Sequence, residues 1–453
     1  MKVNEAIFRE YDIRGIADSD LTDGTAVLLG KAIGTFVRKK GGQSFSVGRD
    51  CRLSGPRIRK ALIDGLVSTG LNVVDIGLVP TPLLYFSVFH LNTDGGVQIT
   101  GSHNPPEHNG LKVCVGKTTL HGEEIQELKE LVRSQAFAQG RGTISEADIK
   151  KDYAQHIFRT VKPPFPLKVV VDSGNGTAGV IAPELFRRLG CEVIELFSEP
   201  DGNFPNHPPD PTVPESQKVL ISEVQRHKAH VGIGFDGDAD RVAVVDPSGK
   251  ALFGDELLVL YARRLLKDHP GATVISEVKA SHRLFQDIAQ HGGKPILWKT
   301  GHSLIKAKMK ETGALLAGEM SGHMFFKDRY FGFDDAIYAA VRLFEILSEE
   351  KKTAFELLRD LPPSFCTPEI RMECSDDKKF EVVSRAKKQF EGKGYRVNSI
   401  DGARVEFKDG WGLVRASNTQ AVLVLRFEAT SAERLQEIRT DIETTVHQII
   451  SAL

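Results

Sequence analysis

Cysteine is scarce in this sequence, with five residues among 453, and no two of them form a CxxC pair. An odd count without framework spacing argues against a disulfide scaffold and favours free thiols in a reducing compartment. Long apolar runs are missing too, so no segment is expected to span a bilayer. The N-terminal stretch MKVNEAIFREYDIRG also lacks the apolar core of a signal peptide. We therefore expect a cytoplasmic protein.

An excess of charge of either sign is missing as well. The chain carries 59 basic and 60 acidic residues. Proteins that bind nucleic acids or membrane surfaces present strongly basic faces, so we expect neither kind of partner. A length of 453 residues is more than one hydrophobic core usually holds, and it predicts three or four domains.

Three segments repeat one pattern, in which a β-rich run, a polar loop and an amphipathic stretch closed by glycine precede a second β-rich run. This order is typical of a βαβ unit with parallel strands. Gly70, Gly190 and Gly292–Gly293 occupy the position of a helix C-cap. The segments are residues 45–82, 167–197 and 272–302. They predict three related mixed α/β domains, with loops at the carboxyl ends of their strands.

The last part of the chain differs from this pattern. Residues 377–394 and 431–453 predict helices, and the runs between them predict antiparallel strands around Asp-Gly turns. Such a mixture indicates a C-terminal α+β domain, and LRDLPPSFCTP at 358–368 is typical of a linker before it. The expected domains are residues 1–148, 149–250, 251–362 and 363–453.

The loop GFDGDADRVAVV places Asp236, Asp238 and Asp240 at alternating positions between two apolar runs. An extended loop would point all three carboxylates to one side, where they repel one another unless a cation lies between them. Oxygen ligands favour Mg²⁺ or Ca²⁺. An EF-hand is excluded, because its sixth position holds Arg241 and its twelfth holds Pro247. The alternative is a solvated acidic turn.

The loop ITGSHNPPEHNGLK holds one serine, Ser102, after an apolar stretch. Pro105 and Pro106 are expected to stiffen the loop, and Gly101 and Gly110 to permit its bends. A serine hydroxyl is a poor nucleophile until other groups hold and activate it. The surroundings of Ser102 therefore decide whether it takes part in chemistry.

Two further loops carry side chains of the kinds that can bind hydroxyls or a phosphate. GEMSGH at 318–323 alternates Glu319, Ser321 and His323, which can bind neighbouring sugar hydroxyls, although a polar hairpin turn is the alternative. RASNTQ at 415–420 offers a forked cation, hydroxyls and an amide, which suit a phosphate, although a decorated hairpin loop is the alternative. The phosphate-binding candidates are Arg415, Ser417, Asn418 and Thr419.

The loop SGNGTAG raises a different hypothesis. Gly174, Gly176 and Gly179 match GxGxxG between a predicted strand and a helix, and Glu195 ends the next strand, where a ribose-binding acid belongs. A nucleotide-binding dehydrogenase is therefore an alternative enzyme class. By itself the pattern is weak, because a helix entered from a strand often needs small residues.

The segments FREYDIRG, TGSHNPPEHNGLK, GFDGDADR, GEMSGH and RASNTQ together resemble, in order and spacing, the signatures of the α-D-phosphohexomutases. The resemblance spans Phe8 to about Ala429 and is greatest for the bacterial phosphomannomutase/phosphoglucomutase group. Members often have a proline after the last asparagine–threonine pair, where this chain has Gln420 and Ala421. The family implies four domains around a central cleft, with one loop from each domain in the site.

The resemblance also implies a reaction. In that family a serine, here Ser102, carries a phosphoryl group and exchanges it with a hexose 1-phosphate or 6-phosphate through a 1,6-bisphosphate. It implies one Mg²⁺ per chain, held by Asp236, Asp238, Asp240 and the phosphate on Ser102. The substrates would be mannose or glucose phosphates, and a hexose 1,6-bisphosphate would serve as intermediate and activator. A phosphoglucosamine mutase and a non-catalytic sugar-phosphate binder remain alternatives, and the chain could be a monomer or a dimer.

Site roles carried over from the family by motif fall into two groups. Lys112 and Arg14 would lie beside the transferring group, with Lys112 as the candidate for proton transfer and His302 or His323 as alternatives. His103 would shape the loop. The substrate-binding candidates are Tyr11, Arg241, Lys279, Glu319, Ser321, His323, Arg415, Ser417, Asn418 and Thr419.

Overall fold

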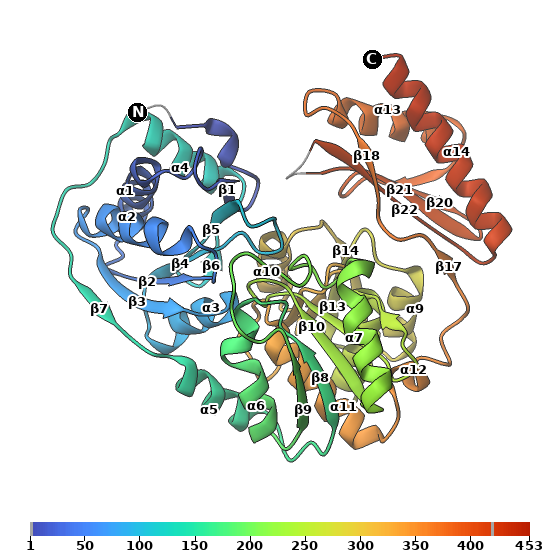
Figure 1. Cartoon of the computed structure of the whole chain (residues 1–453). Coiled ribbons are helices and arrows are strands. Elements are labelled where there is room, and N and C mark those ends of the chain that lie inside the picture. The colour runs from blue at the N-terminus through green and yellow to red at the C-terminus, as the bar shows by residue number, and fades with distance from the viewer. Residues whose placement is uncertain (1–2, 418–420) are drawn as a thin grey trace.

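The protein is described by a computed structural model over residues 3–417 and 421–453. In this part of the chain four β-sheets follow one another, and helices cover them (Figure 1). Each sheet takes its strands from one continuous stretch of sequence. The predicted architecture, three mixed α/β units followed by an α+β unit, is therefore confirmed, whereas the domain boundaries at residues 148, 250 and 362 stay a prediction.

The first sheet has the strand order β1-β5-β4-β2-β3-β7, with β6 paired to β5. Strands β2 and β4 are parallel, whereas β4 and β5 form an antiparallel hairpin. The loop of that hairpin carries Ser102. The strands are β1 (Ile13–Ile16), β2 (Ser44–Arg49), β3 (Asn72–Leu78), β4 (Gly95–Ile99), β5 (His108–Val115), β6 (Thr118–Thr119) and β7 (Ile144–Glu146). The helices are the short 3-10 turn η1 (Glu5–Ile7), α1 (Asp23–Lys39), α2 (Gly55–Val67), α3 (Thr81–His90), α4 (Glu123–Ser134) and α5 (Lys150–Thr160).

The second sheet has the order β12-β11-β10-β8-β9, and the third has the order β14-β13-β15-β16. The second unit contains β8 (Lys168–Asp172), η2 (Thr177–Val180), α6 (Ala182–Arg188), β9 (Glu192–Leu196), α7 (Pro214–His227), β10 (Val231–Phe235), β11 (Val242–Val245) and β12 (Ala251–Leu252). The third unit contains α8 (Gly254–Asp268), β13 (Thr273–Glu277), α9 (His282–Gln290), β14 (Lys294–Trp298), α10 (His302–Thr312), β15 (Leu316–Gly318), β16 (Met324–Phe326), α11 (Ala336–Glu350) and α12 (Ala354–Leu357).

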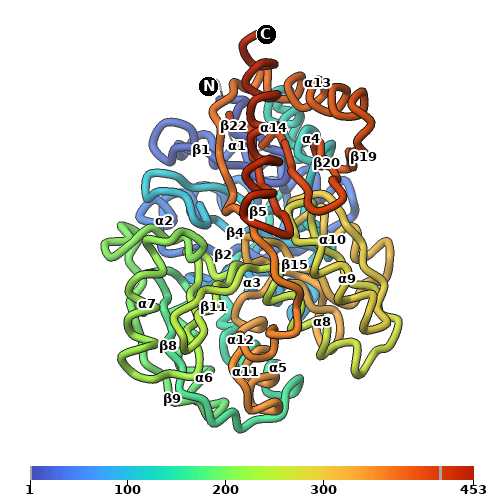
Figure 2. The backbone as a smooth tube through the Cα atoms, turned by 90° about the vertical axis from the view of Figure 1, so that its right-hand side faces the viewer, coloured from blue at the N-terminus to red at the C-terminus, as the bar shows by residue number. Residues whose placement is uncertain are grey.

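The fourth sheet is antiparallel, with the order β17-β22-β21-β20-β19 and with β18 paired to β22. Its elements are β17 (Phe365–Cys366), β18 (Ile370–Glu373), α13 (Lys379–Gly392), β19 (Arg396–Asn398), β20 (Ala403–Phe407), β21 (Gly410–Ala416), β22 (Val422–Ala429) and α14 (Ala432–Ser451). The predicted linker at 358–368 therefore contains the short strand β17. In Figure 1 and Figure 2 this unit lies at one end of the molecule.

The three predicted βαβ units are confirmed, because β2 and β3, β8 and β9, and β13 and β14 pair in parallel and each pair is joined through a helix. Gly70, Gly190 and Gly292 have φ values of 84°, 97° and 79°, as a left-handed C-cap requires. The Ser431 side chain accepts a hydrogen bond from the backbone N–H of Arg434 and caps α14.

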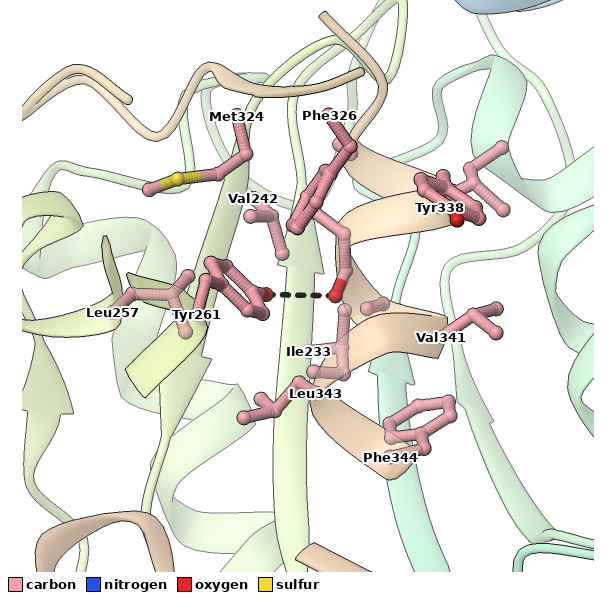
Figure 3. Close-up of a cluster of buried hydrophobic side chains, with 14 of the residues drawn as sticks. Ile233, Val242, Leu257, Tyr261, Met324, Phe326, Tyr338, Val341, Leu343 and Phe344 are labelled. Atoms are coloured by element: carbon pink, nitrogen blue, oxygen red, sulfur yellow. Dashed lines mark hydrogen bonds between the residues drawn. The ribbon is translucent and has the colours of Figure 1, made fainter. Parts of the chain in front are cut away.

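One buried hydrophobic cluster extends from α3 of the first unit through the second and third units. Figure 3 shows part of it, around α11. There the Tyr261 hydroxyl donates to the Ala339 carbonyl oxygen over 2.7 Å, and Phe326 contacts Tyr338 edge-on. The fourth unit has a separate core between its sheet and its two helices. Three units are thus packed as one body, and none of the helices described has the length and apolar content needed to cross a membrane.

Candidate active site

Ser102 lies in the loop between β4 and β5 and is almost completely buried, with 1% of its surface exposed. Its φ of 49° is in the left-handed region, which a non-glycine residue rarely adopts. The Ser102 hydroxyl donates to Asp236 Oδ2 over 2.9 Å and lies 3.1 Å from His103 Nδ1. A strained backbone held in one position is a frequent property of catalytic loops.

A buried arginine, Arg52, holds this loop in place. Its guanidinium donates to the carbonyl oxygens of Ser102, Asn104, Pro105 and His108, at distances of 2.5–2.9 Å. The sequence interpretation missed this residue, because an arginine that binds backbone carbonyls leaves no motif in its own neighbourhood. Five donors in a rigid fork allow one side chain to fix several carbonyls at once.

Arg52 also changes the interpretation of the loop glycines. Neither Gly101 nor Gly110 has a left-handed backbone, so neither serves a bend of the kind predicted for it. A Cβ atom at Gly101 would instead lie 2.5 Å from the Arg52 guanidinium carbon, and one at Gly110 would lie 2.5 Å from the Ile13 carbonyl oxygen. Glycine is required at both positions because other groups approach closely.

The three aspartates converge as predicted. The ligand oxygens of Asp236, Asp238 and Asp240 lie within 4.8 Å of one another, and all three side chains are fully buried. The prediction of an extended loop was wrong, because the backbone turns tightly, with Ala239 at a φ of 58°. The turn closes through a 3.1 Å hydrogen bond from the Ala239 N–H to the Asp236 carbonyl oxygen. A solvated acidic turn is also excluded by the burial.

Lys112 of β5 supplies positive charge to this cluster. Its ammonium donates to Asp238 Oδ2 over 2.7 Å and also to Asp240 Oδ2. Burial alone would lower the pKa of Lys112, but Asp238 and Asp240 raise it above its ordinary value. Burial, with the charges of Asp238 and Asp240, raises the pKa of Asp236 well above its usual range. The cluster therefore carries more buried negative charge than one lysine neutralises.

The cluster fits a hard divalent cation. It offers carboxylate oxygens from one turn, and Asp238 Oδ1 is buried without a hydrogen-bond partner. An orphaned buried oxygen beside two further carboxylates is the donor set that Mg²⁺ prefers. Asp236, Asp238 and Asp240 would hold the ion, with the Ser102 hydroxyl next to them.

Two histidines near this cluster, His323 and His302, differ in their protonation. His323 lies between Glu319 Oε2 at 3.0 Å and Asp240 Oδ1 at 3.1 Å. Burial alone would lower the pKa of His323, but these two carboxylates raise it to about 9. Burial, with the charges of Lys306 and Lys112, holds the pKa of His302 well below its ordinary value. His323 is thus a cation at neutral pH, and His302 is a neutral base.

The third and fourth units contribute cations. Lys279, which follows β13, donates to Glu369 over 3.0 Å, and Arg415 of β21 donates to Asp401 over 2.7 Å. Ser417 follows β21 at the same edge. Asn418 and Thr419, which were predicted to complete this loop, lie outside the described residues.

One cavity of about 410 Å³ brings these groups together. It takes residues from all four units, and it includes every predicted catalytic and substrate-binding residue that the structure describes. They are Tyr11, Arg14, Ser102, Lys112, Arg241, Lys279, His302, Glu319, Ser321, His323, Arg415 and Ser417. The cavity thus joins Ser102, whose hydroxyl donates to Asp236 of the buried carboxylate cluster, to several cationic and polar side chains from the other units.

Four family models match the chain in succession. They are Phosphoglucomutase/phosphomannomutase, alpha/beta/alpha domain I at residues 5–139, domain II at 151–249, domain III at 253–365 and the C-terminal domain at 369–445. The chain belongs to the phosphoglucomutase/phosphomannomutase family. The resemblance predicted from the five motifs is therefore confirmed.

Relatives in this family match nearly the whole chain. A phosphomannomutase/phosphoglucomutase of Pseudomonas aeruginosa is 48% identical over 448 residues, which cover 99% of this chain and 97% of the relative. A phosphoglucomutase of Neisseria gonorrhoeae is 46% identical over 449 residues, which cover 98% and 97%. The crystal structure of a family protein from Burkholderia thailandensis has a TM-score of 0.93 at 42% identity, and the match covers 99% of this chain and 98% of that one. Members of this family depend on a metal ion, for which this chain has the buried carboxylate cluster.

The glycine loop of the second unit does not offer a dinucleotide site. The Gly174, Asn175 and Gly176 N–H groups donate to Asp172, Phe197 and Ser173. The Thr177 N–H donates to the carbonyl oxygen of Gly237, inside the aspartate loop. A diphosphate needs free N–H groups at this position, and Glu195 is already paired with Arg187. The loop instead supports the aspartate turn, so the dehydrogenase alternative is not favoured.

The clamp by Arg52 can be tested by hydrogen exchange. Arg52→Lys keeps the positive charge but loses the forked guanidinium. Each lost charge-assisted hydrogen bond is worth about 1.5–3 kcal/mol. The backbone amides in residues 100–107 are therefore expected to exchange at least about tenfold faster. Arg57→Lys, further along the chain on α2, is the matched control, because its guanidinium binds a different loop. Equal exchange of this segment in both variants would contradict the clamp.

The metal site can be tested by direct binding. Asp238→Asn removes one of three carboxylate charges, so the dissociation constant for Mg²⁺ is expected to rise about tenfold or more. Isothermal titration calorimetry measures it without an activity assay. Asp268→Asn, on the exposed end of α8, is the control. A Mg²⁺ titration that is identical for both variants would show that the ion binds elsewhere.

Proposed function

We propose that this chain is a phosphohexomutase that interconverts hexose 1-phosphates and 6-phosphates of glucose and mannose. The observation that carries the proposal is the Ser102 hydroxyl, 2.9 Å from Asp236 of the buried carboxylate cluster and inside the four-unit cavity. The names of the relatives from Pseudomonas and Neisseria support glucose and mannose as the sugars. They give no support to the phosphoglucosamine alternative.

The reaction has two phosphoryl transfers. In the first, the bond from phosphorus to Oγ of phosphorylated Ser102 breaks, a bond to a sugar hydroxyl oxygen forms, and the hydroxyl proton passes to a base. The product is a hexose 1,6-bisphosphate. After this intermediate has turned in the cavity, its other phosphoryl group returns to Ser102, and a proton returns to the sugar oxygen. The transfer needs alignment and charge neutralisation more than any other form of catalysis.

Charge neutralisation comes from residues around Ser102. Lys112 and Arg14 supply positive charge within the cavity, and one bound Mg²⁺ would withdraw charge from the seryl phosphate. The base was predicted to be Lys112, but its ammonium is paired with two aspartates, and His323 is paired with two carboxylates. His302 is the neutral one of the three candidates, and we assign the proton transfer to it.

Different loops would bind the sugar hydroxyls and the phosphate that is not being transferred. Glu319 and Ser321 would bind sugar hydroxyls, with Tyr11 and Lys279 nearby in the cavity. The phosphate that is not being transferred would bind Arg415 and Ser417, together with Asn418 and Thr419. A hexose 1,6-bisphosphate would serve as both intermediate and activator. The five cysteines are free thiols, which agrees with the cytoplasm as the proposed location.

The serine mechanism makes a prediction about mass and rate. The purified protein is expected to carry about 80 Da of additional mass, one phosphoryl group on Ser102, which is measured by intact mass spectrometry. Ser102→Ala should lose this mass and nearly all turnover, because a methyl group cannot accept a phosphoryl group. Ser321→Ala should keep the mass. Substantial turnover by Ser102→Ala would contradict the phosphoserine intermediate.

The phosphate clamp makes a separate prediction. Arg415→Ala removes a contact worth roughly 1.5–3 kcal/mol, so kcat/KM should fall about tenfold to a hundredfold. The loss should be similar for glucose 1-phosphate and mannose 1-phosphate, because the clamp binds phosphate and not the sugar. Release of free bisphosphate per turnover should also rise, since the intermediate is held less tightly.

The control for this variant is Arg434→Ala, on α14 of the same unit and outside the cavity. It should change neither kcat/KM nor the release of bisphosphate. A loss confined to one sugar, or unchanged release in Arg415→Ala, would refute the clamp assignment.

A further inference from the structure

A second cavity, of about 190 Å³, lies between the first and third units. It is bounded by α3, by the β5–β6 turn, by α10 and by the segment after β16. It shares no lining residue with the active-site cavity described above. We call it the lysine pocket, because Lys117, Lys306, Lys310 and Lys327 line it.

The charge of the lysine pocket has one sign. Four lysines line it, and none of its described lining residues is an aspartate or a glutamate. Lys117, Lys310 and Lys327 are exposed at its rim, whereas Lys306 is mostly buried. Lys306 is paired with Asp334, so the positive potential that favours an anion comes mainly from the three lysines at the rim.

Two of the residues that line the pocket, Tyr85 and Thr119, carry buried hydroxyls without a hydrogen-bond partner. Tyr85 Oη and Thr119 Oγ1 accept and donate no hydrogen bond, although the two residues are only 2% and 5% exposed. A buried hydroxyl left unpaired costs stability, so such groups normally mark a bound water or ligand. Burial raises the pKa of Tyr85 well above its ordinary value, so its hydroxyl keeps its proton and can donate.

Aromatic rings form the rest of the wall. Phe89 and Phe331 have centroids 4.6 Å apart, Phe331 and Phe333 stack at 5.8 Å, and the Lys117 ammonium lies 5.0 Å from the Phe89 ring. The pocket therefore combines an apolar wall with two free hydroxyl donors and four cations. An organic anion matches this combination better than an inorganic ion does.

We propose that the lysine pocket binds a small phosphate ester whose carbon part packs against the phenylalanine rings. The phosphate would bind the lysines and the hydroxyls of Tyr85 and Thr119. Lysine acts as a point charge toward phosphate, and several lysines can share its oxygens. The ligand would touch both the first and the third unit, so its binding would hold these two units together.

The pocket also contacts the wall of the active site through one side chain. The Lys306 ammonium lies 4.2 Å from the centroid of the Tyr85 ring and donates to Asp334 Oδ1 over 2.8 Å. Asp334 is fully buried, and its other oxygen lies 3.7 Å from His302 Nδ1. A phosphate in the pocket would compete with Asp334 for Lys306. Occupancy is therefore expected to change the rate of the active site, and the two sites should affect each other's affinity reciprocally.

The binding experiment uses calorimetric titration of the whole chain with phenyl phosphate and with inorganic phosphate, in EDTA so that no metal ion takes part. Lys310→Gln/Lys327→Gln is expected to bind phenyl phosphate at least about tenfold more weakly than the wild type, since two charged contacts are lost. Lys308→Gln, on the same helix as Lys310 but outside the pocket, is the matched control and should bind like the wild type. Arg415→Ala should retain the binding, because Arg415 lines only the other cavity.

Three results would overturn the site. They are equal binding by Lys310→Gln/Lys327→Gln and the wild type, loss of all binding in Arg415→Ala, and inorganic phosphate that binds as tightly as phenyl phosphate. The binding test does not depend on the proposed mutase activity. For the coupling, phenyl phosphate should change kcat of the wild type at saturating glucose 1-phosphate and leave kcat of Lys310→Gln/Lys327→Gln unchanged. An unchanged wild-type kcat would overturn the coupling alone.

Discussion

Three aspartate carboxylates buried in one turn are the constraint on which this structure depends. Charges without water repel one another, so Asp236, Asp238 and Asp240 need positive partners. Lys112 of the first unit and His323 of the third unit supply them. The same charges that suit a metal ion therefore also join three units of the chain. Ser102 donates to this cluster, so its position is fixed by the same electrostatics.

The fourth unit is attached differently. Its core is separate, and it meets the third unit through buried arginines that donate to backbone carbonyls, such as Arg404 to Val278 and Ala280. A small apolar contact between Val278 and Trp411 adds to them. Polar contacts of this kind position the fourth unit on the third without burying a large apolar area. Under the proposed function, such an attachment suits the unit that would bind the phosphate that is not being transferred, while the intermediate turns.

The sequence predicted much of this arrangement, for identifiable reasons. The βαβ units were recognisable because hydrophobic periodicity and glycine C-caps are local signals. The aspartate loop was recognisable because its alternating carboxylates have few explanations. The local conformation of that loop was predicted wrongly, since period-two spacing does not distinguish an extended segment from a tight turn at Ala239. Arg52 was missed because the loop carbonyls that it binds lie fifty or more positions away in the chain and carry no side-chain signature.

The sequence by itself determined the family, the order of the units and the candidate residues that line the cavity, because these depend on short motifs. Only the tertiary structure decided how those residues are charged and what holds them. His302 and His323 are both histidines in polar loops, yet burial beside cations makes the first neutral, and two carboxylates make the second a cation. The lysine pocket likewise exists only where α3, α10 and the β5–β6 turn meet. Charge state and cavity shape depend on neighbours brought together from distant parts of the chain, so no local pattern could encode them.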